Sequence, residues 1–443
     1  MIFRFLTYIR PTWYFNLIPK KGCHVFPQVD LLDQAIKDQL IYDANYISKT
    51  SSNRDLSWQA FQKGFVNTKA SLEFKEVVPV VDEYRFVRKY HKPIWAIYCL
   101  LIRLLTFHNP IKEFKAWYKT RNVVYTNIFE NPIQETTWKI FKSSLLASKP
   151  KVSVIIPTLN RYPYLKDVLS DLEKQEYKNF EVIVMDQSEP FQKEFFEQFD
   201  LELKVHFQKE KALWLARNTA IKISEADYFL LFDDDSRVEK DWISNHIKGL
   251  DFYNAAISSG QSISKPKELL PQNYRYFRVS DLLDTGNVLI KKKVFETIGL
   301  FDNQFEKQRM GDGEFGLRSY LNGFVNISNP YATRLHLKVG TGGLRQMGSW
   351  DAFRPKKMLS PRPIPSVLYL YRSYFGNKLS KYALLKTLPS SIISYKFKKN
   401  KKMQIFGVLI SILLVPILLL QVFRSWRLAS IKIKQGALIE KFK

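Results

Sequence analysis

The pattern of apolar and polar positions changes in character near residue 150. From Lys151 onward, short apolar runs alternate with segments in which apolar residues recur every three or four positions. Short apolar runs are typical of buried strands, and the longer spacing predicts amphipathic helices. Strands expected at 151–158, 181–186, 203–207 and 228–232 therefore alternate with helices. This order predicts a mostly parallel sheet with right-handed crossovers.

The first 148 residues are rich in aromatic side chains and predict a mainly helical extension. The run IWAIYCLLIRLLTF at 94–107 is nearly all apolar but too short to cross a bilayer comfortably. A buried helix is expected there, with a helix at a membrane interface as the alternative. Arginines and a proline interrupt the first 15 residues, which argues against the apolar core of a signal peptide. Residues 143–151 predict a linker.

Most of the net charge lies at the C-terminal end. The chain carries +26 overall, and residues 352–443 contain 19 Lys or Arg against one acid, Glu440. That region alone is +18, and the 351 residues before it carry only +8. Basic segments attract nucleic acid, anionic lipid headgroups or acidic substrates. The choice among these partners therefore depends on the uncharged sequence that lies within this basic region.

An uncharged apolar run, IFGVLISILLVPILLLQVF at 405–423, interrupts this basic region and contains Pro416 near its middle. It is long enough to cross a hydrocarbon core, and basic residues flank it on both sides, so charge gives it no orientation. We favour a helix lying in, or dipping into, the cytoplasmic leaflet. A true span and a buried helix packed on the central domain are the alternatives.

An anionic membrane surface accounts for the lysines and the apolar run together, whereas no nucleic-acid-binding module is visible. No nucleic-acid partner is therefore expected. The two cysteines, Cys23 and Cys99, form no metal-type spacing and no disulfide framework. We expect the protein at the cytoplasmic face of the plasma membrane, either peripheral or with one C-terminal membrane segment.

Three consecutive carboxylates, Asp233, Asp234 and Asp235, directly follow the strand expected at 228–232. Open α/β sheets bind ligands at the carboxyl ends of their strands. Adjacent like charges repel one another, and a bound divalent cation would stabilise them. Oxygen ligands suit Mg²⁺ or Mn²⁺, especially where a diphosphate completes the coordination shell. A solvated acidic turn is the alternative for such a triplet in isolation.

Six motifs, in order, resemble those of glycosyltransferase family 2, the inverting enzymes of GT-A fold. They are VIIPTLNR at 154–161, VMDQS at 184–188, ARN at 216–218, FDDD at 232–235, DTGNVLI at 284–290 with the turn that follows, and GDGEFGLR at 311–318. The resemblance covers roughly residues 151–345. It implies a GT-A catalytic domain at 149–350, Rossmann-like with flanking helices, between a helical N-terminal extension (1–148) and a basic, helical, membrane-associating region (351–443).

The resemblance also implies a role for each candidate residue. Asp233 and Asp235 would hold the metal, and His336 would complete its shell. Asp312 would remove the proton from the acceptor hydroxyl, with Glu314 as the alternative base. The remaining candidates would bind the nucleotide or its phosphates: Pro157, Thr158, Asn160, Arg161, Asp186, Arg217, Asp234 and Arg345. The glycines at 340, 342 and 343 predict a loop able to close over the diphosphate.

Two positions depart from the family pattern. Ala212 replaces a glycine that often precedes the ARN motif, and Gly311-Asp312 replaces a common Glu-Asp pair. The second departure leaves the choice between Asp312 and Glu314 open. Purely structural alternatives are helix capping by Asn160, an ion pair for Arg217 and ordinary first-turn helix positions for the two acids.

Together these features predict a metal-dependent inverting glycosyltransferase of the hexosyltransferase type. It would move a sugar from a nucleotide-diphosphate donor to a hydroxyl of a glycan or lipid-linked acceptor. Cell-surface polysaccharide synthesis is the process expected by analogy with the family. A catalytically silent sugar-nucleotide-binding relative and a basic membrane or nucleic-acid adaptor remain as alternatives.

Overall fold

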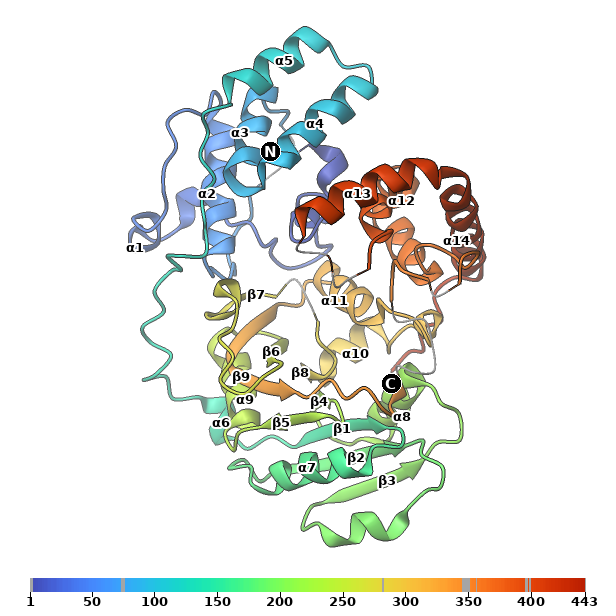
Figure 1. Cartoon of the computed structure of the whole chain (residues 1–443). Helices are drawn as coiled ribbons and strands as arrows, with labels where there is room; N and C mark the ends of the chain where they lie inside the picture. Colours follow the sequence, from blue (N-terminus) through green and yellow to red (C-terminus); the bar gives the residue numbers. More distant parts are fainter. Residues whose placement is uncertain are drawn as a thin grey trace. The chain divides into compact units, whose positions relative to one another are not determined.

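The computed structural model describes residues 3–72, 76–280, 283–344, 351–355, 357–394, 397 and 400–442 (Figure 1). The chain forms two compact units. Unit 1 comprises residues 1–141, 270–279 and 321–323, and unit 2 comprises 142–269, 280–320 and 324–443. The division into three parts predicted from the sequence is finer than this and stays a prediction.

Unit 1 is mainly helical and is built around aromatic side chains. The ring of Phe15 lies 4.6 Å from that of Phe26 and 5.5 Å from that of Trp58, centroid to centroid. The helix predicted at 94–107 is present, but only one of its faces is buried, and Ile94, Leu101 and Leu105 are exposed. The elements are α1 (Gln34–Lys37), α2 (Lys49–Gln62), α3 (Val80–Tyr90), α4 (Pro93–Leu105), α5 (Pro110–Lys119) and the short strand β7 (Arg278–Val279).

Unit 2 is organised around a sheet with the strand order β3-β2-β1-β4-β8-β6-β9-β5. The four strands predicted from the sequence run parallel to one another, whereas β8 pairs antiparallel with both β4 and β6. Only three residues separate β4 from β5, although β5 is at the far edge of the sheet, so the sheet must curl. The strands are β1 (Val152–Thr158), β2 (Phe180–Asp186), β3 (Leu203–Phe207), β4 (Tyr228–Phe232), β5 (Ser236–Val238), β6 (Ile257–Ile263), β8 (Asn287–Lys291) and β9 (Asn326–His336).

The pairing register brings the predicted motifs to one edge of this sheet. Thr158 at the end of β1 pairs with Asp186 at the end of β2. Phe232, the last residue of β4, pairs with Asn287 at the start of the antiparallel strand β8. Asp233 therefore follows β4 next to the backbone that leads into β8. This geometry explains why residues far apart in sequence meet at one place.

Helices flank the sheet, and the fold class predicted from the sequence is confirmed, with mainly helical regions before and after the α/β core (Figure 1). The spacing of Phe191, Phe195, Phe196 and Phe199 predicts a helix after β2, but this segment instead forms a short 3₁₀ helix at Lys193–Gln198. The helices of unit 2 are α6 (Ser144–Ala147), α7 (Tyr162–Glu173), α8 (Leu213–Ile223), α9 (Trp242–Phe252), α10 (Lys292–Ile298), α11 (Gly311–Leu321), α12 (Pro365–Ser391), α13 (Lys401–Leu413) and α14 (Val415–Gln435).

The apolar run at 405–423 does not form one continuous helix. It is divided between α13 and α14, which meet at Leu414 with a bend of 83°. Pro416 has no N–H to continue the hydrogen-bond ladder, and its ring would clash with the carbonyl four residues earlier, so the helix breaks here. Within the described residues, no single helix has both the length and the apolarity to cross a bilayer. The bent pair meets both criteria only when its two helices are taken together.

Candidate active site

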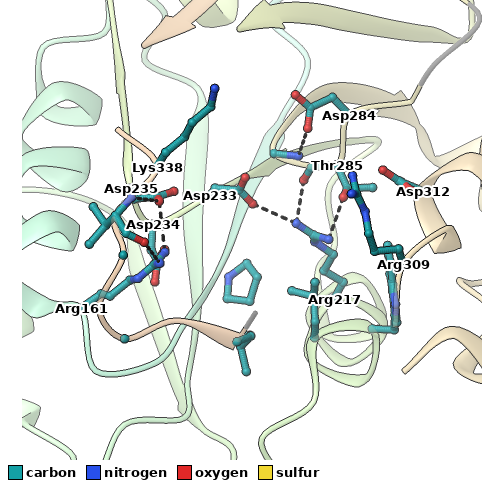
Figure 2. A pocket seen from close by; sticks show the side chains of 18 of the residues that line it. Arg161, Arg217, Asp233, Asp234, Asp235, Asp284, Thr285, Arg309, Asp312 and Lys338 are labelled. Atoms are coloured by element: carbon teal, nitrogen blue, oxygen red, sulfur yellow. Dashed lines mark hydrogen bonds and ion pairs between the residues drawn. The ribbon is translucent and has the colours of Figure 1, made fainter. Parts of the chain in front are cut away.

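A cavity of about 540 Å³ opens at the carboxyl ends of β1 and β4. The three consecutive aspartates after β4 line it, and so does Asp312 at the start of α11. Figure 2 shows Arg161, Asp234, Asp235 and Lys338 on one side, with Asp233 between them and a second group that includes Arg217. The two acidic groups predicted from separate motifs therefore share one cavity.

Asp233 lies between two buried arginines. Its Oδ1 accepts a hydrogen bond from Nη2 of Arg217 at 3.1 Å, and its Oδ2 accepts one from Nη1 of Arg334 at 2.8 Å. Arg334 also binds Asp284, Ser236 and Ser262 through its other N–H groups. Buried charges are stable only when they are paired in this way. The position of the Asp233 carboxylate is thus fixed from both sides.

Gly286 makes this arrangement possible. A Cβ added to Gly286 would lie 2.1 Å from Oδ2 of Asp233 and 2.2 Å from Nη1 of Arg334. Any other residue at this position would push the ion pair apart. The glycine of the DTG motif is therefore explained by the close approach of the backbone just before β8 to the Asp233–Arg334 pair.

Helix α8 positions Arg217. The carboxylate of Glu306 accepts hydrogen bonds from the backbone amides of Leu213, Trp214 and Leu215, so it satisfies the first turn of the helix. Arg217, one turn further along, donates from Nη1 to Oγ1 of Thr285 at 2.8 Å as well as to Asp233. The predicted ARN arginine thus connects α8 to the acidic edge of the sheet.

Asp234 points to the opposite side, toward β1. Its Oδ1 accepts from Nη1 of Arg161 at 2.8 Å, and its Oδ2 accepts from the hydroxyl of Thr158 at 2.8 Å. Burial raises the pKa of Asp234 to about 6. Gly343 packs against Arg161 so closely that a Cβ there would lie 2.4 Å from the guanidinium carbon. The glycine-rich segment therefore lies against the arginine that pairs with Asp234.

The residues predicted to bind a metal lie together. Asp233, Asp235 and His336 each offer a ligand atom, and these atoms lie within 4.8 Å of one another. Nε2 of His336 is 3.3 Å from Oδ1 of Asp235. Burial opposes ionisation of Asp235, but His336 and Arg161 outweigh it and lower the pKa of this carboxyl. Each carboxylate oxygen has two lone pairs, so the arginine contacts leave acceptor capacity for a cation. This donor set fits Mg²⁺ or Mn²⁺.

The structure separates the two candidate bases. Asp312 lines the cavity near Arg309, as Figure 2 shows. Glu314 is absent from the lining residues and is buried, pairing with Nε of Arg318 at 2.8 Å and accepting from the hydroxyl of Tyr374 at 2.6 Å. The geometry therefore favours Asp312 as the base. Gly311 replaces a larger residue because a Cβ there would lie 2.5 Å from the Trp214 ring.

The other predicted nucleotide-binding residues have different surroundings. Pro157 lines the cavity, whereas the Asn160 side chain accepts from the backbone amide of Glu189. Asp186 is buried away from the cavity lining, where it accepts hydrogen bonds from the Tyr162 hydroxyl at 2.6 Å and from the Ser188 amide at 2.8 Å. Arg345 lies outside the described residues. The roles predicted for these residues stay predictions.

Sequence reasoning missed Arg334, Asp284 and Arg309. Arg334 is on β9 two positions before His336, and this spacing places both side chains on one face of a strand. That alternation was the available signal, but the polar composition of β9 concealed the strand. Asp284 is the first residue of the DTGNVLI motif, but the motif gave it no role of its own, and Arg309 belongs to no motif. The fold brings both residues to the cavity.

Comparisons with known proteins identify the family of the central part of this chain. The glycosyl transferase family 2 model matches residues 153–315. Glycosyltransferase GlyA of Streptococcus pneumoniae serotype 4 is 29% identical over 168 residues, which cover 36% of this chain and only 22% of GlyA. A Methanococcus voltae enzyme, dolichyl N-acetyl-alpha-D-glucosaminyl phosphate 3-beta-D-2,3-diacetamido-2,3-dideoxy-beta-D-glucuronosyltransferase, is 24% identical over 230 residues, which cover 42% of this chain and 68% of that enzyme.

Among solved structures, mannosyltransferase PcManGT from Pyrobaculum calidifontis, in complex with GDP-Man and Mn²⁺, is 16% identical, with a TM-score of 0.39 over 67% of this chain and 91% of that one. The S. aureus TarS structure is 18% identical, with a TM-score of 0.38 over 55% of this chain and 44% of that one. The family match covers the strand ends, the acidic triplet and Asp312. On the family match and the curated relatives, residues 153–315 of this chain form a glycosyltransferase family 2 domain.

Proposed function

We propose that this protein is a metal-dependent inverting glycosyltransferase that transfers a sugar from a nucleotide-diphosphate donor to a hydroxyl of a glycan or lipid-linked acceptor. One observation carries the proposal: Asp233 and Asp235, which lie next to His336, and Asp312 belong to different motifs but line one cavity. Inverting transfer requires the leaving group and the base on opposite faces of the sugar, and a shared cavity is the minimum condition for that arrangement.

The residues of the chain divide the reaction between them. Asp312 would accept the proton of the acceptor hydroxyl as the new C1–O bond forms and the C1–O bond to the diphosphate breaks. Arg217 and Arg334 hold Asp233, and Arg161 holds Asp234 and Asp235, so the acidic edge keeps its geometry as charge develops. When bound, a divalent cation would supply Lewis-acid stabilisation of the departing diphosphate.

The name of one relative supports a lipid-linked acceptor. The Methanococcus voltae enzyme acts, by its name, on a sugar phosphate attached to dolichol, and its match covers 68% of that enzyme. A sugar hydroxyl carried on a lipid phosphate is the same chemical class of acceptor that we propose here. Cell-surface polysaccharide synthesis is the corresponding process.

Thermal unfolding with a panel of nucleotide sugars tests donor binding. With a matching donor and Mn²⁺, we expect the midpoint to rise by roughly 2 °C or more, because a ligand in excess stabilises only the folded state. The rise should disappear with a chelator and in Asp235→Asn. Asp200→Asn, which changes an exposed aspartate of the same unit, is the matched control and should keep it. No metal-dependent shift with any donor would contradict the proposal.

Release of nucleoside diphosphate separates an enzyme from a silent relative. The full chain with Mn²⁺ and the stabilising donor should release the diphosphate slowly even with water as the acceptor. Asp312→Asn should bind the donor with an unchanged midpoint shift while its release rate falls. Binding without any metal-dependent release in the unmodified protein would indicate a silent sugar-nucleotide-binding relative.

A further inference from the structure

Helices α13 and α14 distribute their side chains in the opposite way to helices of water-soluble domains, with the large apolar side chains on the outside. Their inner faces, toward α12 and the segment after it, carry mostly small or polar residues, and a Cβ on Gly407 would lie 2.5 Å from the Ile393 side chain. On α14, Gln421, Ser425 and Ala429 are buried at intervals of four residues, and Leu418 is the one large apolar side chain buried with them. Soluble helices bury their large apolar side chains instead. Small residues facing a neighbouring helix are typical of packing in an apolar environment.

The outer faces carry the large apolar side chains. The most exposed of them follow one helical face, at positions i, i+4, i+7 and i+8 on α13 and at positions i and i+4 on α14. Exposed apolar patches of more than a few hundred Å² mark sites of interaction with proteins or membranes. The six most exposed members, 58% to 80% accessible, are Ile405, Leu409, Ile412, Leu413, Leu419 and Phe423. We call these six residues the apolar face.

The helices that carry the apolar face also carry exposed basic side chains and have no acidic ones. Lys402, Arg424, Arg427 and Lys434 are exposed on the same two helices. Glu440 is the only acid between 352 and 443, and it pairs with Lys222 at 2.9 Å. Two copies meeting at this face would bring two strongly basic regions together. An anionic, apolar partner matches both properties at once.

The C-terminal segment attaches these helices to the α/β core. The backbone amide of Leu300 donates to the carbonyl of Glu440 at 2.9 Å, and the amide of Leu438 donates to Oδ1 of Asp302 at 2.9 Å. The hydroxyl of Tyr369 on α12 donates to Oδ2 of Asp302 at 2.8 Å. Tyr374, also on α12, donates a hydrogen bond to Glu314 on α11, the helix that carries Asp312 in its first turn. The apolar face is therefore connected to the catalytic core through specific contacts.

We propose that the apolar face docks this chain onto a bilayer that contains anionic lipids. The helices α13 and α14 lie in the boundary between headgroups and acyl chains, and the neighbouring lysines and arginines contact the lipid phosphates. The 83° bend suits an in-plane arrangement better than a straight crossing. This inference does not depend on the proposed transferase activity, since it rests on the exposed helices alone.

Flotation of the full chain with vesicles tests the proposal. Wild type should float with vesicles of phosphatidylcholine and phosphatidylglycerol and bind at least tenfold more weakly to phosphatidylcholine alone. A variant with Leu409→Gln, Leu413→Gln, Leu419→Gln and Phe423→Gln should bind the mixed vesicles at least tenfold more weakly than wild type. Glutamine is a good helix former, and the four positions are exposed, so folding is preserved. An unchanged thermal midpoint checks this.

The matched control changes four other exposed apolar residues to glutamine, and it should float like wild type: Ile41, Val77, Ile140 and Leu269. A third variant, with Ile94→Gln, Leu101→Gln and Leu105→Gln, changes the exposed face of α4. Loss of flotation in that variant, with full flotation of the α13/α14 variant, would overturn the proposal. Bound wild type that resists alkaline extraction would indicate a spanning segment and would also overturn it. A lipid-free dimer that fails to bind vesicles would point to a second copy instead.

Discussion

Asp312 and Glu314 are two residues apart on α11, but their carboxylates lie in different surroundings. Asp312 lines the cavity, and Glu314 is buried with Arg318 and Tyr374. We expect Asp312→Asn to lower kcat by roughly 10²- to 10⁴-fold, the usual contribution of a general base, with the KM of the donor little changed. Steady-state kinetics with the donor identified by thermal shift would measure both parameters.

Glu314→Gln is the matched control for this prediction, and its effect should appear in stability. Removing the charge leaves Arg318 without its buried partner, which costs a few kcal/mol in comparable cases. The variant should unfold at lower temperature yet keep most of its kcat below that temperature. If Glu314→Gln abolished turnover while Asp312→Asn kept it, the assignment of the base would be reversed.

His246 provides a pH-dependent term in stability. It is fully buried between the hydroxyl of Ser258 and Oδ1 of Asn287, each at 3.0 Å, and burial lowers its pKa from 6.5 to about 4. The unfolded chain therefore binds more protons than the folded protein between these values. The contribution of His246 to stability is fully present above about pH 6.5 and is lost as pH falls toward 4, by about 2 kcal/mol at pH 5.

The variant His246→Gln should remove this dependence. Between pH 7 and pH 5, its free energy of unfolding should fall by about 2 kcal/mol less than that of wild type. Denaturant titrations at the two pH values would measure the difference. His206→Gln changes an exposed histidine of the same unit and should follow wild type. Equal slopes for wild type and His246→Gln would contradict the prediction.

The acidic triplet could be predicted from sequence because its signal is local. A fully apolar strand followed by three carboxylates has few interpretations, and the cavity lies where the strand order predicted it. Arg334 could not be predicted, because its meaning depends on Asp233 and Asp284, which are 101 and 50 residues away in the chain. Pairing at such distances depends on the fold, and the alternation of Arg334 with His336 along β9 does not reveal these partners.

At the scale of elements, the parallel half of the sheet was predictable and the antiparallel half was not. Strands β1, β2 and β4 are mostly apolar and buried on both faces, so each contains a recognisable apolar run. Strand β6 is ISSGQSI, and its polar residues are buried through hydrogen bonds such as that of Gln261 Nε2 to the Ser328 hydroxyl at 2.7 Å. A polar strand whose partners come from another polar strand has no hydrophobic signature.

The C-terminal segment yields a prediction at this same scale. Gly299 ends α10 with φ +78°, and a Cβ there would lie 2.6 Å from Ile439 and 2.9 Å from the carbonyl of Glu440. Gly299→Ala should therefore lower the free energy of unfolding for two reasons. The alanine strains the backbone, and its Cβ displaces residues 438–442. Together these effects should cost about 2–3 kcal/mol. Denaturant unfolding and limited proteolysis of the C-terminal segment would measure them.

Gly436 is the matched control, because it has nearly the same backbone conformation, φ +80°, but an added Cβ would meet nothing within 4 Å. Gly436→Ala should lower the free energy of unfolding only through backbone strain, by about 1 kcal/mol. The difference between the two variants then isolates the contact of the C-terminal segment with the core. Equal losses of stability would mean that this contact contributes nothing.

At the scale of the whole molecule, charge and composition predicted a basic C-terminal region distinct from a nearly balanced body. The sequence did not predict that the helix axis turns sharply at Leu414. An apolar run with one proline is equally compatible with a single membrane-spanning helix that is only kinked. Nor did it predict the composition of unit 1, which takes in residues 270–279 from within the family 2 match and residues 321–323 just after it. These two segments are assigned to unit 1 by their tertiary contacts, which a local sequence pattern does not show.

Two compact units with separate cores predict that heat unfolds this protein in more than one transition. The candidate active site lies entirely within unit 2. Mn²⁺ with UDP or GDP, whichever the donor panel selects, should therefore raise the midpoint of one transition and leave the other unchanged. Differential scanning calorimetry would measure both. Gly299→Ala assigns the transitions independently, because it should lower only the midpoint that the nucleotide raises. A nucleotide that moved both midpoints together would mean that the two units unfold as one cooperative body.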